Sequence, residues 1–279
     1  RPPPDPMRPG SRTPLPLACL ALLAWHGASA QPGPEETPAA PAPAGESPQA
    51  APATPEAALE ATYETFRAAF AAGRYADAVV TGQEVVRLAQ QVSGPLDDDV
   101  ATALNNLGVA QLRAGDLAGA EESFGESLEL LETTQGIGSR RMIAPLAGLG
   151  ATYMAREEPG RSAEAYERAI AVSRRALGLF NLEQLDLMDA LISAYSAVGF
   201  TEGLDRERRY ALQVVEQRYG LRDPRTLPRL LQLAEWYEAS GRYLPSRTVY
   251  RGVLEVATRE GGEITTRSSG RSIMVCGPR

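Results

Sequence analysis

A turn-forming motif recurs in this sequence at a fixed interval of 42 residues, and that spacing limits what the chain can fold into. The motif centres on Gly73, Gly115, Gly199 and Gly241, which are 42, 84 and 42 residues apart. The missing member falls at Glu157, within the turn-forming sequence Glu-Glu-Pro-Gly. A period that runs five times without an insertion predicts one supersecondary unit, repeated along the chain and stacked on its neighbours.

The segments between these turns have the apolar spacing of amphipathic helices. Leu59, Tyr63, Phe66 and Phe70 lie three or four residues apart and therefore share one helical face. Residue types also recur in register from unit to unit, in the columns Leu107, Leu149, Leu191, Leu233; Gly108, Gly150, Ile192, Ala234; and Phe124, Tyr166, Tyr250. Small residues in such columns let two helices approach closely, and a ring fills the space between them.

These columns resemble the tetratricopeptide repeat, which places large, Leu, Gly or Ala, and Tyr residues on its first helix (helix A). Its second helix (helix B) carries Ala, Phe or Tyr, and Ala. The third repeat of this chain follows the pattern with Leu146, Leu149, Gly150 and Tyr153, then Ser162, Tyr166 and Ala169. A 42-residue unit exceeds the family's usual length of about 34, and it is similar to the longer variant of kinesin light chains and many bacterial proteins.

The resemblance implies an all-α fold, an α-solenoid of about five helix-turn-helix repeats in which antiparallel helix pairs form a right-handed superhelix. It covers residues 55–260, with repeats at about 58–98, 99–140, 141–182, 183–224 and 225–259. Two repeats depart from the pattern. The first has Gly82 where a ring is expected, and the fourth has Leu204 and Arg208 in the small and ring positions. We expect these two repeats to pack less well than the others.

The residues before the repeats have the features of an export signal. Two arginines precede a short apolar run from Leu15 to Trp25, and small residues precede Gln31. This pattern predicts a signal peptide over residues 1–30, with possible non-native residues before Met7, in an exported bacterial-type protein that is periplasmic or secreted. An uncleaved anchor is the alternative, although the apolar run is shorter than the roughly 20 residues of a membrane span.

Two further segments lack apolar periodicity. Residues 31–54 are rich in Pro and Ala, and we expect a disordered linker there, because such a segment buries too little surface to offset its ordering entropy. Residues 261–279 mix Gly, Ser, Arg and Thr, and no capping helix follows the fifth repeat. This tail is either disordered or altered from a native one, or something else covers the open face of the last repeat.

Cleavage after residue 30 leaves a chain with few reactive side chains. It removes His26, the only His, and Cys19, so that Cys276 is the only Cys left. Without an imidazole, Ser-His-Asp and Cys-His catalysis and metal sites built on His are excluded. All 28 basic residues are Arg, and the cleaved chain holds 25 of them against 34 acidic residues, a formal net charge of −9. That charge argues against nucleic acid and against an anionic membrane surface as partners.

The acidic residues offer two candidate sites, each with a simpler interpretation. The run 97–99 lacks the Gly and Glu spacing of a calcium loop, and it directly precedes a helix, where acids cap free N–H groups. The pairs Asp186 with Asp189 and Glu235 with Glu238 are three residues apart, as on the solvated face of a helix. A hydrolase would need two acids that converge across a cleft.

The resemblance places a partner-binding groove on the concave side, lined by positions of helix A that are offset from the packing columns. Carried over by register, the groove residues are Tyr63, Arg67, Asn105, Val109, Leu112, Arg113, Ala151, Met154, Asp189, Ser193, Glu235 and Glu238. This groove is expected to be mildly basic at its N-terminal end, small and apolar in the middle, and acidic at its C-terminal end. Close helix packing is the alternative interpretation of the apolar middle.

Together these observations predict a non-catalytic scaffold of the cell envelope that has no cofactor and no metal. It binds a peptide or a partner segment in its concave groove. The partner is then a protein or peptide, not nucleic acid, and not a membrane once the signal is cleaved. The alternatives are a structural component that assembles into homo-oligomers and a carboxylate-dependent hydrolase.

Overall fold

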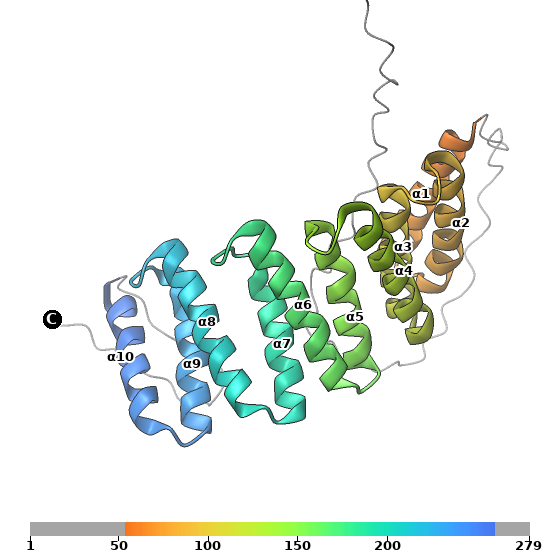
Figure 1. The fold of residues 1–279 in the computed structure, drawn as a ribbon. Helices are drawn as coiled ribbons and strands as arrows, with labels where there is room; N and C mark the ends of the chain where they lie inside the picture. The colour runs from red at the N-terminus through yellow and green to blue at the C-terminus, as the bar shows by residue number, and fades with distance from the viewer. Residues whose placement is uncertain (1–53, 260–279) are drawn as a thin grey trace, which may run out of the picture. The chain divides into compact units, whose positions relative to one another are not determined.

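The computed structural model describes residues 54–259, which are helical throughout apart from short turns and contain no strand (Figure 1). The α-helices are α1 (Pro55–Ala71), α2 (Tyr75–Ser93), α3 (Asp98–Ala114), α4 (Leu117–Gln135), α5 (Ile143–Ala155), α6 (Pro159–Leu177), α7 (Gln184–Val198), α8 (Thr201–Tyr219), α9 (Leu227–Ala239) and α10 (Tyr243–Arg259). The 3-10 helices η1 (Arg140–Met142) and η2 (Pro224–Thr226) directly precede α5 and α9. The predicted signal peptide (1–30), linker (31–54, except Thr54) and tail (261–279) lie outside the described residues.

The helices belong to two compact units, one ending at Gly136 and the other beginning at Ile137. In the first unit, α1 packs against α2, α2 against α3, and α3 against α4. In the second unit, each helix from α5 to α10 packs against the next one along the chain. Odd-numbered helices are helix A and even-numbered helices are helix B of their repeats. Each unit is a stack of antiparallel helix pairs (Figure 1), which confirms the predicted all-α solenoid fold.

One residue with left-handed backbone joins helix A to helix B in every repeat. Gly73, Gly115, Gly199 and Gly241 have φ of +72°, +84°, +72° and +72°, and Glu157, in the remaining place of the period, has φ +60°. In all five turns the N–H of the following residue bonds to the carbonyl five residues before it, at 2.8–3.0 Å. This is the bond of a Schellman helix end, for which glycine is favoured. The turn predicted at Glu157 is confirmed, and it is made without glycine.

Aspartate side chains cap two of the helix starts, and the sequence analysis predicts the first of these caps. The Asp97 carboxylate accepts a hydrogen bond from the Asp99 N–H at 2.9 Å at the start of α3. Asp223 accepts one from the Arg225 N–H, also at 2.9 Å, at the start of η2. These bonds satisfy N–H groups that have no partner in the first turn of a helix. The capping interpretation is therefore confirmed for Asp97.

A ring on one helix meets a glycine on its partner helix in the first three repeats. In the second repeat the ring lies on helix B, and a Cβ added at Gly108 would lie 2.8 Å from Phe124; the third repeat has the same arrangement. In the first repeat the roles are exchanged, because Phe66 on α1 lies 3.2 Å from a Cβ added at Gly82 on α2. Phe66 is only 1% exposed. The ring that the sequence did not find on helix B of the first repeat therefore comes from helix A, and that this repeat packs less well than the others stays a prediction.

The fourth repeat has a charged side chain in the ring position. Arg208 lies half-buried on α8, with its guanidinium carbon 5.2 Å from the centre of the Trp236 ring on α9. Burial lowers the pKa of Arg208 from its usual value, because a low-dielectric environment disfavours the charged form. The Nε atom of Arg208 is buried without a hydrogen-bond partner. This contact of a cation with a ring joins the fourth repeat to the fifth. Within the fourth repeat, a Cβ added at Gly203 on α8 would lie 2.8 Å from the Tyr195 ring on α7.

Candidate functional site

The predicted groove positions of the first unit include three buried residues. Tyr63, Asn105 and Val109 are 8%, 2% and 2% exposed. The Tyr63 ring stacks on Phe66, with ring centres 6.1 Å apart. Helix α3 is buried at every position from Val100 to Gln111, so register does not separate groove from core on this helix. These three residues are packed side chains and do not form open surface in this structure.

Asn105 differs from the other buried positions because it is polar. Neither its side-chain nitrogen nor its side-chain oxygen has a hydrogen-bond partner among the described residues. Leaving such a group buried and unpaired costs roughly 1–3 kcal/mol. Native proteins rarely keep such a group without a role for it. Asn105 is therefore a predicted groove residue whose buried amide has unsatisfied hydrogen-bonding groups.

The remaining groove positions of the first unit are accessible. Arg67 and Arg113 are exposed, and Leu112 is half-buried. Arg67 pairs with Glu64, one turn earlier on the same helix, at 2.9 Å. An exposed pair of this kind contributes at most about 1 kcal/mol. Arg113 forms no hydrogen bond or ion pair within residues 54–259, so its charge is available at the end of α3.

In the second unit, the middle of the predicted groove is packed. Ala151 on α5 is 7% exposed, and Met154, at the end of the same helix, is half-buried. Ala151 directly follows Gly150, where an added Cβ would lie 2.7 Å from the Tyr166 ring on α6. The close-packing interpretation of these small residues therefore accounts for Ala151.

Asp189 on α7 and Arg229 on α9 form an ion pair with two hydrogen bonds. Arg229 Nη2 donates to Asp189 Oδ2 at 2.9 Å, and Nη1 donates to Oδ1. The Arg229 side chain is 13% exposed, and its Nη1 also donates to Gln232 at 3.1 Å. Ser193, one turn beyond Asp189, is exposed and donates its hydroxyl to the Asp189 carbonyl at 3.0 Å. Helix A of the fourth repeat is thus tied to helix A of the fifth, and paired bonds of this kind fix geometry as well as charge.

The acidic end of the predicted groove contains arginines that the sequence analysis did not place there. Glu238 is exposed and accepts a hydrogen bond from the Tyr250 hydroxyl at 3.1 Å. Burial, together with this bond, raises the pKa of Tyr250 to about 12. Glu235 is half-buried, and its charge acts on Arg208. Because Arg208 and Arg229 lie among the three acids, this end has a smaller negative excess than the sequence predicts.

These contacts give the acidic residues structural roles. Asp189 is held by Arg229, and Glu238 is held by Tyr250.

Within residues 54–259, no three side chains of His, Cys, Asp or Glu gather in a way that would hold a metal ion. No described helix combines the length and the apolar character that a membrane crossing requires.

Sequence reasoning missed Arg229 and Trp236 as members of this surface. Their neighbours Asp189 and Arg208 were singled out, but as a groove residue and as a departure from the ring column. The available signal was the spacing of Asp189 and Arg229, which are 40 residues apart. This is close to one period, so the two residues lie at neighbouring places on successive A helices.

Comparison with known proteins agrees with this architecture. Tetratricopeptide repeat profiles match residues 63–133 and residues 146–183, and no curated protein matches the chain in sequence. Repeats of a Podosopora anserina protein assigned to the kinesin light chains are 18% identical, with a TM-score of 0.60 over 73% of this chain and 96% of that chain. BtubC (BKLC) from P. vanneervenii is 16% identical, with a TM-score of 0.60 over 80% and 89% of the two chains.

A third similar structure, the MamA protein, is 15% identical, with a TM-score of 0.51 over 78% of this chain and 98% of that chain. Identities this low are informative about the fold alone. Residues 63–133 and 146–183 carry tetratricopeptide-type repeats, and the described helices share the fold of solved proteins with such repeats; repeats of this type generally serve as scaffolds for protein–protein interaction.

Proposed function

We propose that the chain is a non-catalytic scaffold, exported to the cell envelope, that holds an extended segment or a helix of a protein partner along its A helices. The observation that carries this proposal is the ion pair between Asp189 and Arg229. It joins Asp189, a position that register assigns to the groove, to helix A of the next repeat, so α7 and α9 offer one continuous surface. A surface fixed by such a pair loses little freedom on binding, which favours affinity.

The chemistry of this surface favours a polar, partly cationic partner segment. Ser193 and Glu238 are exposed on α7 and α9, and Glu235 is half-buried beside them. The acids still outnumber the two arginines among them, and complementary charge contributes to specificity and to the association rate.

The groove is tested by charge reversal with a matched control. Peptides are first selected on the full chain from a displayed random library, and their affinities are measured by fluorescence anisotropy. We expect selected peptides rich in Lys or Arg, and roughly tenfold weaker binding with reduced salt dependence in the Glu235→Arg, Glu238→Arg variant. The control variant Glu164→Arg, Glu202→Arg changes exposed positions of helix B by the same charge and should bind normally. Equal affinity of both variants would reject the groove.

Export is tested separately, because it depends only on the N-terminal segment. Residues 1–54 are fused to an alkaline phosphatase that is active only outside the cytoplasm. We expect phosphatase activity and a mature protein that begins at Gln31. A fusion that stays inactive, beside an active fusion carrying an established signal, would contradict the proposed location.

Self-assembly is a second candidate, favoured by the exposure of one leucine in α10. Leu254 is 39% exposed, whereas the leucine or isoleucine one and two periods earlier, Leu212 and Ile170, are 9% and 3% exposed. Leu212 lies in a core cluster with Leu230 and Leu233 of α9, whereas α10 is the last helix among residues 54–259. Light scattering should then show a mass that rises with concentration and that Leu254→Glu reduces to the monomer value. A constant monomer mass would oppose self-assembly.

A further inference from the structure

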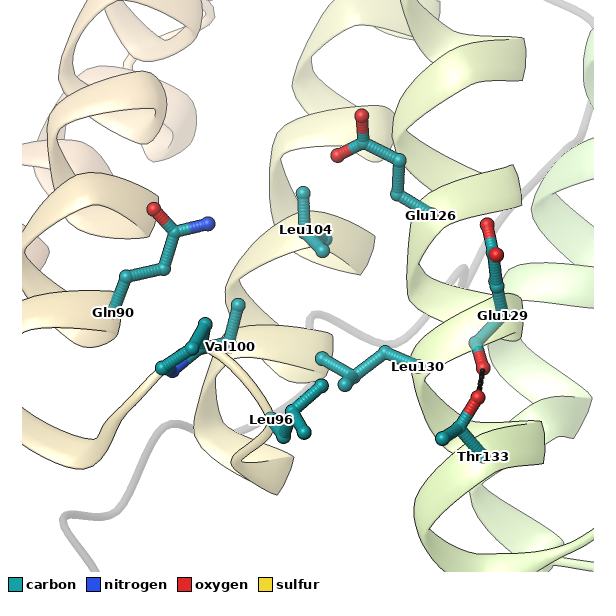
Figure 2. A pocket seen from close by; sticks show the side chains of 9 residues that line it. Gln90, Leu96, Val100, Leu104, Glu126, Glu129, Leu130 and Thr133 are labelled. Carbon is teal, nitrogen blue, oxygen red and sulfur yellow. Dashed lines mark hydrogen bonds between the residues drawn. The ribbon is translucent and has the colours of Figure 1, made fainter.

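The first unit contains a pocket of about 260 Å³ bounded by α2, the turn after it, the start of α3, and α4 (Figure 2). Five apolar residues line it, Pro95, Leu96, Val100, Leu104 and Leu130. None of the predicted groove residues lies in its wall. Its volume is below the roughly 300–1,000 Å³ typical of small-molecule sites, so its size suits one or two side chains of a partner.

The rim of this pocket is acidic. Glu126 and Glu129 on α4 line it, and both side chains are exposed (Figure 2). Neither carboxylate has a hydrogen bond or an ion pair within the described part of the chain. Leu96 in the turn is 66% exposed, while Val100 and Leu104 beneath it are 1% and 6% exposed. The pocket therefore combines a buried apolar floor with two unneutralised negative charges.

The corresponding place in the second unit is closed by side chains of this chain. Two periods after Leu96 and Glu126 stand Phe180 and Tyr210, whose rings stack with their centres 6.1 Å apart. The guanidinium carbon of Arg174 lies 4.2 Å from the centre of the Tyr210 ring. An aromatic pair covered by a cation thus occupies the space that Leu96 and Glu126 leave open in the first unit.

Hydrogen bonds hold this closed arrangement in place. The Tyr210 hydroxyl donates to the Leu179 carbonyl at 2.7 Å, and Gln184 Nε2 donates to the same carbonyl at 2.6 Å. Arg174 Nε donates to Gln184 Oε1 at 2.9 Å. In the first unit, Gln90 and Val100 stand in the places of Arg174 and Gln184. Gln90 supplies an amide where Arg174 supplies a guanidinium, and Val100 supplies no polar group where Gln184 supplies an amide, so the cation–ring cluster cannot form there.

We propose that the pocket of the first unit is a docking site for a partner segment carrying an aromatic side chain next to an arginine or lysine. The aromatic side chain fills the apolar space that Phe180 and Tyr210 fill in the second unit. The neighbouring cation lies against Glu126 and Glu129, which have no other partner. The second unit shows that this architecture accommodates a ring together with a guanidinium. This site shares no residue with the proposed groove and does not depend on it.

The test uses the full chain with labelled methyl groups and three peptides of equal length. The first contains Gly-Ser-Tyr-Arg-Ser-Gly, the second replaces Tyr by Ala, and the third replaces Arg by Glu. We expect the methyl resonances of Leu96, Leu104 and Leu130 to shift on titration with the Tyr-Arg peptide. The Ala-Arg and Tyr-Glu peptides should bind at least roughly tenfold more weakly, because each lacks one of the two contacts.

Two variants separate the pocket from other surfaces. Leu96→Phe with Glu126→Tyr reproduces the residues of the second unit, and it should fill the pocket and abolish binding while the helical circular dichroism is kept. Glu126→Gln with Glu129→Gln keeps the apolar floor and should weaken binding roughly tenfold at low salt. If the filled variant does not fold, the glutamine variant decides alone.

The charge-reversed groove variant distinguishes binding in the pocket from binding in the groove. The Glu235→Arg, Glu238→Arg variant should bind the Tyr-Arg peptide through the pocket as well as the unmodified chain does. Three results would each overturn the proposed docking site. They are no shift of the lining methyl resonances at millimolar Tyr-Arg peptide, binding of the Ala-Arg peptide as tight as that of the Tyr-Arg peptide, or binding by the glutamine variant as tight as by the unmodified chain.

Discussion

Replacing Glu157 by glycine should stabilise the second unit, because Glu157 adopts a left-handed backbone that glycine adopts without strain. Its φ is +60°, while the glycines one and two periods away have φ between +72° and +84°. The Glu157 side chain is exposed and forms no hydrogen bond or ion pair among the described residues. Loss of this side chain therefore removes no hydrogen bond or ion pair. The conformational preference of the backbone alone decides whether the free energy of unfolding rises or falls.

The magnitude follows from two opposing terms. A left-handed conformation costs an L-residue roughly 1–2 kcal/mol, and glycine avoids that cost. Glycine also increases the conformational entropy of the unfolded chain, which lowers the free energy of unfolding by about 0.4–1 kcal/mol. The free energy of unfolding should thus rise by roughly 0.5–1 kcal/mol, and the midpoint of thermal unfolding by roughly 1–4 °C for a chain of this size.

Urea denaturation followed by far-ultraviolet circular dichroism measures this change, with the slope m compared between variants to exclude altered cooperativity. Glu157→Ala is the matched control, because it removes the same side chain but keeps a Cβ. Glu157→Asn should lie between the two, since asparagine tolerates the left-handed region better than alanine. Gly199→Ala imposes the opposite change in the same unit and should destabilise it. If Glu157→Gly and Glu157→Ala are equally stable, the backbone of Glu157 stores no strain and the reasoning fails.

Three further predictions concern packing and titration. Gly150→Ala should cost about 1–3 kcal/mol in urea denaturation, because its Cβ would lie 2.7 Å from the Tyr166 ring; Gly125→Ala, with no atom within 4 Å, should instead add roughly 0.5–1 kcal/mol. Burial raises the pKa of Tyr166 to about 12, so its stabilising contribution is full below pH ~10 and is lost as the pH rises through ~12; thermal midpoints in this range should show the loss in the native chain and less of it in Tyr166→Phe. The side-chain hydrogen bond from Arg225, aided by the backbone N–H, lowers the pKa of Asp223 to about 2, so its contribution is full above pH ~4 and disappears as the pH falls through ~2; Asp223→Asn should flatten that part of the acid profile.

The sequence predicts those parts of the fold that depend on neighbouring residues. The turns at Gly73 and Gly115 and the cap at Asp97 are local, because each depends on the conformation or the hydrogen bonds of a few consecutive positions. The turn at Glu157 was predicted without a local signal for left-handed backbone, since the period required a turn there. Repetition therefore supplies information that a single repeat does not contain.

The parts that were missed depend on how helices meet. Phe66 was assigned to an apolar face, yet its role as the ring that covers Gly82 depends on the depth at which α1 and α2 interlock. The ion pair of Asp189 with Arg229 depends on the rotation of α7 relative to α9 and on the rotamers of two long side chains. Register alone identifies the position of a residue on its helix and leaves the partner on the next helix undetermined, which is why the acidic end of the groove was predicted to be more negative than it is.

The exchange of ring and glycine in the first repeat bears on the pocket as well. At the crossing of helices A and B, one helix supplies a ring and the other a glycine, as in the pairs Phe66 with Gly82 and Phe124 with Gly108. Packing therefore requires a certain total side-chain volume at the crossing, and either helix can supply it. The same rule applies where a turn meets the following helix B. In the second unit that volume is completed by Phe180 and Tyr210. In the first unit Leu96 and Glu126 leave it incomplete, and Glu126 also brings a charge that a purely structural site would not need. The pocket of the first unit therefore lacks apolar volume and a positive charge. A partner that carries a ring beside a cation supplies both.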